Sequence, residues 1–108
     1  MEAKDIDGHR PSKWIPVTDL RQLAALGKLM EELGELQSIV ARTIIQGGIN
    51  ECDPETGEEN GASLQDELAD VRGMIILVSE LYGFDKEYIH ARADKKLRMK
   101  RDWLEMLT

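Results

Sequence analysis

The chain has 108 residues, of which 42% are hydrophobic and 32% charged, and this length and composition predict one compact domain with a modest core. A net charge of -7 argues against a nucleic-acid-binding surface, because proteins that bind nucleic acids usually present a basic face. The single cysteine, Cys52, excludes a disulfide within the chain, and no apolar run reaches the roughly 18–20 residues that span a membrane, so we expect a cytoplasmic protein.

Residues 1–17 are expected to form an irregular arm, because Gly8, Pro11 and Pro16 interrupt a polar stretch that has no helical periodicity. Trp14 stands out in this arm as a large apolar side chain. Two roles are open for it: a lid that pins the arm to the core, or a wall of a binding pocket.

The first long helix is expected to begin after Thr18 or Asp19, either of which can cap it, and to run to about Gln46, where Gly47 and Gly48 end it. Apolar residues recur along it every three or four positions. We expect these to face the core: Leu26, Leu29, Leu33, Leu36, Val40 and Ile44. Residues 47–62 then predict a long loop that acts as a lid or as a contact between subunits.

Ser63 followed by Asp66 resembles a capping box and predicts the start of a second helix, which ends near Tyr82 and Gly83. This helix contains five consecutive apolar residues, 74–78, which cover almost every side of a helix and therefore predict burial against other helices or a second subunit. Asp85 can cap a third helix that extends through Leu107. The three helices predict an all-α fold, a helical bundle completed by oligomerisation. The apolar stripe of the last helix is expected to comprise Ile89, Ala93, Leu97 and Leu104.

Two acidic clusters, residues 31–35 and 66–70, lie about thirty residues apart on the first two predicted helices. Each contains two carboxylates three residues apart, Glu32 with Glu35 and Glu67 with Asp70, so each pair shares one helix face. Two such faces turned toward each other make a cage of four carboxylates, which would repel one another without a cation. Carboxylates suit Mg²⁺, with Mn²⁺ as the alternative, and Mg²⁺ commonly shares its ligands with phosphates. The sequence therefore predicts a metal site and a phosphorylated substrate.

The pattern Glu-x-x-Glu, a spacer and Glu-x-x-Asp resembles that of the MazG-like all-α nucleotide pyrophosphohydrolases. The resemblance covers roughly residues 18 to 101 and continues through Tyr-Gly-Phe-Asp at 82–85 to Ala-Asp-Lys-Lys-Leu at 93–97. Shorter features at 21–29 and 45–48 are similar to phage-type dATP/dGTP pyrophosphohydrolases, including the MazZ-like branch that acts for phages with modified adenine; such a protein would work in the host cytoplasm.

The resemblance implies a site for each part of a nucleotide. The metal ligands it implies are Glu32, Glu35, Glu67 and Asp70. It makes Lys96 a phosphate contact, and we assign Lys28, on the same row as Glu32, to the phosphates as well. Asp94 stands where the family commonly has Asn, and with Trp14 we assign it to the nucleobase.

The implied reaction is hydrolysis of a nucleoside triphosphate to the monophosphate and pyrophosphate, with dGTP favoured ahead of dATP. Glu31 or Glu35 would orient or deprotonate the attacking water, and the sequence leaves both open. The resemblance also implies a homodimer or homotetramer. The alternative is a non-catalytic helical adaptor module that binds a metal or a nucleotide.

Overall fold

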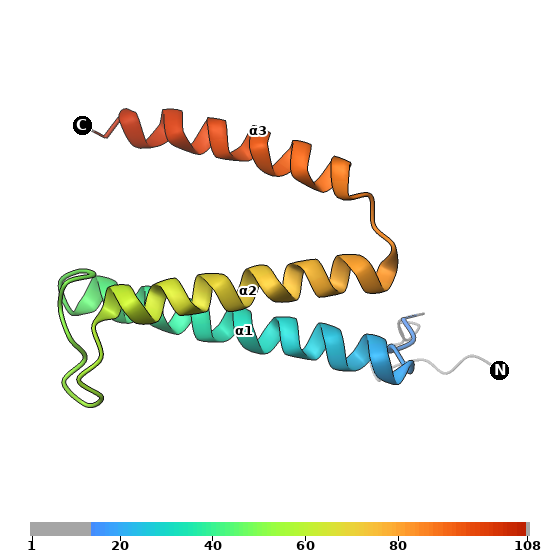
Figure 1. The fold of residues 1–108 in the computed structure, drawn as a ribbon, viewed down its shortest axis with the longest axis horizontal. Helices are drawn as coiled ribbons and strands as arrows, with labels where there is room; N and C mark the ends of the chain where they lie inside the picture. Colours follow the sequence, from blue (N-terminus) through green and yellow to red (C-terminus); the bar gives the residue numbers. More distant parts are fainter. Residues whose placement is uncertain (1–13, 108) are drawn as a thin grey trace, which may run out of the picture.

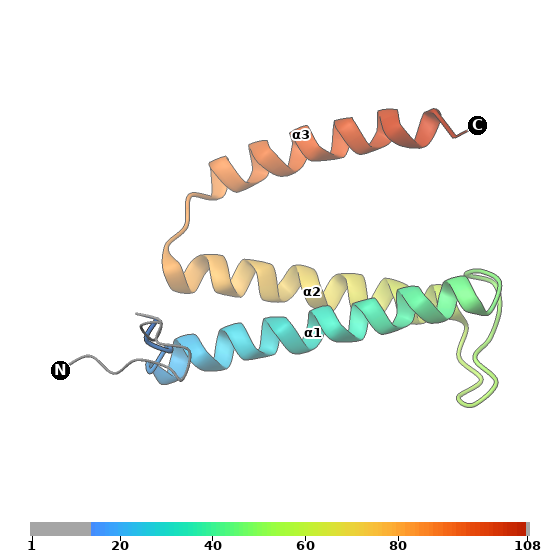
Figure 2. The same cartoon turned by 180° about the vertical axis from the view of Figure 1, so that it is seen from behind.

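The computed structural model describes residues 14–107, and these residues form three α-helices and no β-strand. They are α1 (Leu20–Ile45), α2 (Asn60–Tyr82) and α3 (Lys86–Glu105). α1 and α2 run side by side as an antiparallel hairpin, and α3 turns back along α2 but diverges from it (Figures 1 and 2). The prediction of an all-α fold is confirmed.

Four of the expected helix ends are confirmed by their capping geometry. A carboxylate oxygen of Asp19 accepts a hydrogen bond from the N–H of Gln22 at 2.9 Å and so caps α1. Gly47 has a φ of 99° and Gly48 one of 126° just beyond α1, and Gly83 adopts the left-handed conformation at the end of α2. At the start of α3, Asp85 accepts hydrogen bonds from two backbone N–H groups. α3 itself ends at Glu105, two residues before the expected limit.

The expected start of α2 at Ser63 is wrong, because the helix begins one turn earlier, at Asn60. The hydroxyl of Ser63 donates to the carboxylate of Glu58 at 3.1 Å instead of capping a helix end. Asn60 is 1% exposed, and its side-chain amide donates to the carbonyl of Gly48, so the helix start is fixed by the preceding loop. A local capping motif could not reveal this non-local contact.

The packed interface between α1 and α2 only partly follows the row of α1 that was expected, of which Leu26, Leu29 and Leu36 are partly buried. Ala25 and Ile39 are buried, at 8% and 1% exposure, and they flank Glu32 at intervals of seven residues. On α2 the facing row contains Val71 and Val78, with Glu67 one turn before Val71. Part of the stripe expected to be buried is instead exposed: Leu33, Val40 and Ile44. The reason is that apolar side chains occupy more than one face of α1, and only one of these faces meets α2.

α3 does not share the α1–α2 interface, which is the extensive helix contact among residues 14–107. No residue of α3 is buried. The prediction that its apolar stripe packs against the core is wrong at Leu97 and Leu104, which are 46% and 57% exposed. The radius of gyration is 19.6 Å, whereas a compact domain of this length would have about 13 Å. Within the described residues, no helix has the length and apolarity needed to cross a membrane.

The segment between α1 and α2 is an ordered turn that projects from the end of the hairpin (Figure 1). Backbone hydrogen bonds cross it from Asp53 to Glu58 at 2.8 Å and from Asn60 to Glu51 at 2.9 Å. Asp53 is buried, forms an ion pair with Arg42 of α1, and accepts the N–H of Glu55 at 2.9 Å. These two interactions, the backbone N–H of Glu55 first and then Arg42, hold the pKa of Asp53 below its ordinary value.

Candidate metal site

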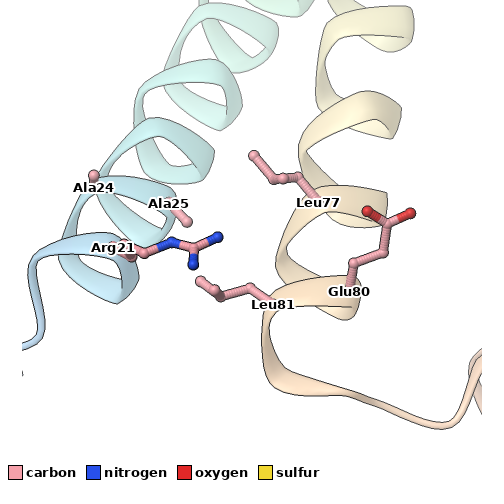
Figure 3. A pocket seen from close by; sticks show the side chains of 6 residues that line it. All are labelled: Arg21, Ala24, Ala25, Leu77, Glu80 and Leu81. Atoms are coloured by element: carbon pink, nitrogen blue, oxygen red, sulfur yellow. The ribbon is translucent and has the colours of Figure 1, made fainter.

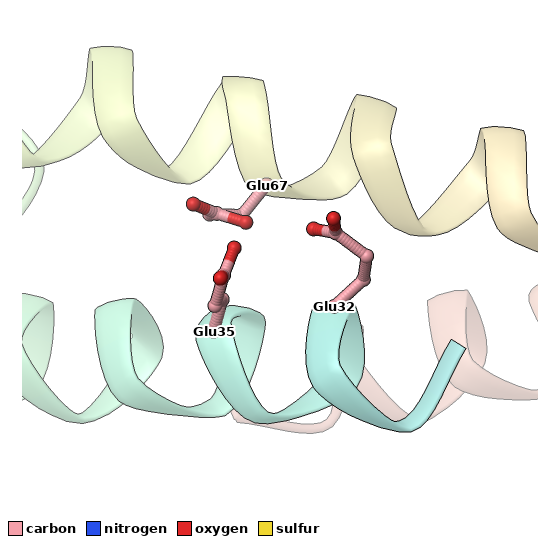
Figure 4. Close-up of side chains that lie close together, drawn as sticks. All are labelled: Glu32, Glu35 and Glu67. Atoms are coloured by element: carbon pink, nitrogen blue, oxygen red, sulfur yellow. The ribbon is translucent and has the colours of Figure 1, made fainter. Parts of the chain in front are cut away.

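Three carboxylates converge between α1 and α2: those of Glu32, Glu35 and Glu67. One oxygen of each lies within 4.8 Å of the other two. Figure 4 shows Glu32 and Glu35 rising from α1 toward Glu67 of α2. The i, i+3 spacing on α1 places the first two on one face, and the antiparallel hairpin brings the third opposite them.

Glu32 is largely enclosed, because its position in the packed row of α1 leaves its side chain 12% exposed. Burial raises the pKa of Glu32, and the negative charges of Glu35 and Asp70 raise it further. Lys28 opposes this shift, since its ammonium group lies 3.7 Å from the Glu32 carboxylate. The site therefore concentrates more negative charge than Lys28 offsets.

Both Glu32 and Glu67 have a buried carboxylate oxygen, Oε2 in each case, with no hydrogen-bond partner. Ionised carboxylates only accept hydrogen bonds, so these oxygens cannot satisfy each other. Buried polar atoms without partners are rare and costly in folded proteins. A divalent cation would satisfy both features, because it provides positive charge and takes oxygen ligands. The residues present thus fit the magnesium or manganese site expected from the sequence.

The other predicted groups of this region lie around the three carboxylates. Asp70 is exposed on α2, one turn after Glu67, and acts on Glu32 through its charge. Lys28 donates a hydrogen bond of 3.1 Å to Glu31, and this contact is the main reason why the pKa of Lys28 is raised. Glu31 therefore forms an ion pair with Lys28 at the edge of the site.

The structure does not bring the predicted residues of α3 or of the arm to the carboxylates. Lys96 and Asp94 are exposed on α3, and Asp94 pairs with Arg98 at 3.3 Å on the same helix. Trp14 is 91% exposed, so the expectation that it pins the arm to the core of its own chain is wrong. Most of the arm, residues 1–13, lies outside the described residues.

An open pocket of about 460 Å³ lies on the same helix pair, two turns of α1 away from Glu32. Leu77 and Leu81 of α2 point across it toward Ala25 of α1, Arg21 reaches into the space between the helices, and Glu80 points away (Figure 3). The sequence analysis did not identify this pocket. A signal existed in the small side chains at 24 and 25, which leave room beside the leucines of α2.

No protein-family model matches the sequence, and neither a curated protein nor a solved structure is significantly similar to it. The functional assignment of this chain rests on the geometry of its own side chains and on the motif resemblance described above.

Proposed function

We propose that this protein binds a divalent cation, Mg²⁺ or Mn²⁺, and hydrolyses a nucleoside triphosphate to the monophosphate and pyrophosphate. The observation that carries the proposal is the convergence of Glu32, Glu35 and Glu67, with two buried carboxylate oxygens that lack partners. Cations held by carboxylates commonly complete their coordination with phosphate oxygens. The family resemblance of the acidic motifs supports the same reaction.

Each residue of the site has a distinct role in this proposal. Glu32 and Glu67 hold the cation, because they supply the enclosed oxygens, and Asp70 adds charge one turn further along α2. The bound cation supplies the positive charge that offsets the phosphates. Glu35 is exposed at the edge of the cluster of three carboxylates, and we assign it to orient and deprotonate the attacking water. Glu31 is the less suitable base, since it is engaged by Lys28.

Two features near the carboxylates suit the remaining parts of a nucleotide. Lys28 is half exposed beside Glu32 and can turn from Glu31 to a phosphate group. The pocket lined by Leu77 and Leu81 lies about 10 Å along α1 from Glu32, at 1.5 Å of rise per residue, and offers apolar walls for a base. From the resemblance we favour a purine deoxynucleotide, dGTP ahead of dATP, and a phosphate contact from Lys96.

Pyrophosphate release from each of the four standard deoxynucleoside triphosphates, with and without Mg²⁺, tests the proposal. We expect release that depends on Mg²⁺ and is fastest with dGTP. The variant Glu67→Gln/Asp70→Asn keeps the shape of both side chains and should abolish the release. Unchanged turnover by that variant would exclude the assignment, and turnover of pyrimidine nucleotides alone would exclude the purine preference.

The alternative function is a non-catalytic adaptor in which the carboxylates form a structural metal site. The enclosed position of Glu32 in the helix interface supports this adaptor as well as it supports the hydrolase, because a cation bound there would join α1 to α2 in both. This alternative predicts that Mg²⁺ raises the melting temperature while no nucleotide is hydrolysed.

We also propose that the chain functions as a homodimer or homotetramer. This proposal is supported by the many large apolar side chains that are exposed in the single chain, which include Ile75, Ile76 and Leu77 of α2 at 46–48% exposure. A cavity of about 440 Å³ beside them, between α2 and α3, is lined by Ile89 and by the two isoleucines. Apolar surface of this extent is typical of subunit interfaces.

A further inference from the structure

The chain has one strongly acidic and one strongly basic segment, and the two lie apart both in sequence and in space (Figure 1). Residues 43–71 contain no lysine or arginine, and the turn within them carries five acids, of which only Asp53 is buried and paired. Residues 95–101 of α3 contain five cations and no acid, and only Arg98 forms an ion pair within the described part of the chain. A strongly acidic and a strongly basic surface therefore coexist on one small protein.

The acidic surface is preformed. The exposed acids are Glu51, Glu55, Glu58 and Glu59, and none of them forms an ion pair within residues 14–107. Backbone hydrogen bonds across the turn, together with the buried Asp53, fix their positions. A surface that is already ordered loses little conformational entropy when a partner binds.

Each charged surface has an exposed apolar neighbour. Ile44, Ile45 and Ile49 adjoin the acidic turn and are 76%, 81% and 53% exposed. The basic stretch of α3 is followed by Trp103, Leu104, Met106 and Leu107, all of which are more than half exposed. The surfaces thus match in both polarity and hydrophobicity: acidic with apolar on one, basic with apolar on the other.

The two surfaces do not meet within one chain. The turn projects from the α1–α2 pair on the side opposite to α3, as both views show (Figures 1 and 2). A second copy of the chain carries the missing partner for each surface. A two-fold axis would use both at once, because the turn of each copy would meet α3 of the other, which gives a closed dimer.

We propose that the acidic turn, residues 46–59, docks on the C-terminal half of α3 of a second copy of this chain. The contact is salt-sensitive, since the charged groups that form it are exposed. Its test measures mass and not turnover, so its outcome can be distinguished from that of the test for nucleotide hydrolysis.

Sedimentation of the full-length protein at about 0.1 M and about 1 M salt, where the Debye length falls from about 10 Å to about 3 Å, tests this contact. We expect Glu51→Lys/Glu55→Lys to raise the dimer dissociation constant at the lower salt by about tenfold or more, since attraction becomes repulsion at two exposed positions. The difference should shrink at the higher salt. A control, Glu80→Lys/Glu87→Lys, has the same change in net charge and should leave the constant within about twofold.

The reciprocal variant decides whether α3 is the docking partner. A mixed dimer of Glu51→Lys/Glu55→Lys protein with Lys100→Glu/Arg101→Glu protein has opposite charges at both contacts, because the reversed turn meets the reversed α3 and the unaltered turn meets the unaltered α3. The mixture should therefore associate more tightly than either variant alone. Circular dichroism establishes that both variants keep their helices. A monomeric wild type, an unchanged dissociation constant in the turn variant, or a mixture that associates no better than its components would each overturn the proposal.

Discussion

Replacing Glu32 by glutamine should change the stability of the metal-free and the magnesium-bound protein in opposite directions. Glutamine keeps the size of the side chain and removes its charge. Burial and the charges of Glu35 and Asp70 raise the pKa of Glu32, so the folded state holds this proton more tightly than the unfolded chain does. At pH 7 the ionised form therefore destabilises the fold, and the penalty is relieved as the pH falls through the raised pKa toward the ordinary value of about 4.3. We expect Glu32→Gln to melt at a higher temperature than the wild type without metal.

Magnesium should reverse this order. A cation that binds only the folded state stabilises it by about 2.7 kcal/mol when present at about 100 times its dissociation constant. At about 4–8 °C per kcal/mol for a small domain, the wild type should gain roughly 11–22 °C. Glu32→Gln lacks one of the three converging carboxylates and should gain much less. The gain in stability that the wild type shows as the pH falls through the raised pKa of Glu32 should also be absent from the variant.

Thermal unfolding followed by circular dichroism, with Mg²⁺ and with a chelator, measures both effects. Glu31→Gln is the matched control, because it removes a neighbouring charge but leaves the three converging carboxylates intact. A lower melting temperature for metal-free Glu32→Gln, or a magnesium-induced gain equal to that of the wild type, would refute the reasoning.

Three further predictions concern the core, the arm and the turn. Ile39→Ala should lower the free energy of unfolding by about 2–5 kcal/mol in denaturant titration, because Ile39 is 1% exposed, whereas Val40→Ala at a 41% exposed position should cost much less. If Trp14 stacks on the base, Trp14→Ala should raise the Michaelis constant by the equivalent of roughly 1–3 kcal/mol and leave the melting temperature nearly unchanged; an unchanged constant would remove Trp14 from the site. The pKa of Asp53 is lowered in the folded state, so the ionised carboxylate stabilises the fold fully above the ordinary pKa of about 3.9, and this stabilisation is lost as the pH falls further. Asp53→Asn has no carboxylate to protonate, so its free energy of unfolding, measured in an acid titration, should fall less than that of the wild type below that pH.

The helices themselves could be predicted because their signals are local. Asp19 and Asp85 cap helices through hydrogen bonds to residues two or three positions later, and Gly83 ends one with its own backbone angles. The start of α2 could not be predicted in this way. It depends on Asn60, whose burial requires Gly48, twelve residues earlier, to be folded back beside it.

The packed faces were harder to predict than the helices. The sequence places apolar residues on several sides of α1, and periodicity cannot tell which side meets α2 and which meets another subunit. Leu33 and Val40 fit a core stripe as well as Ile39 does, but only Ile39 is buried in the single chain. A cage of Glu32, Glu35, Glu67 and Asp70 was predicted from the spacing within each pair and from the family resemblance, and the structure brings the first three together. Lys96 stays a prediction, because its position relative to the carboxylates depends on how copies of the chain assemble.

The location of two glutamates in the packed rows of α1 and α2 has a thermodynamic consequence that links the fold to the proposed cation. Apolar residues at positions 32 and 67 would pack between Ala25, Ile39 and Val71 with no charge to desolvate, so the hairpin would be more stable without a metal. The carboxylates are therefore unfavourable for the empty hairpin and become favourable only when a cation satisfies their buried oxygens. In the proposed metal-bound state, folding and cation binding would share the same side chains, so removal of the cation should loosen the α1–α2 contact at the site before it disturbs the rest of the interface.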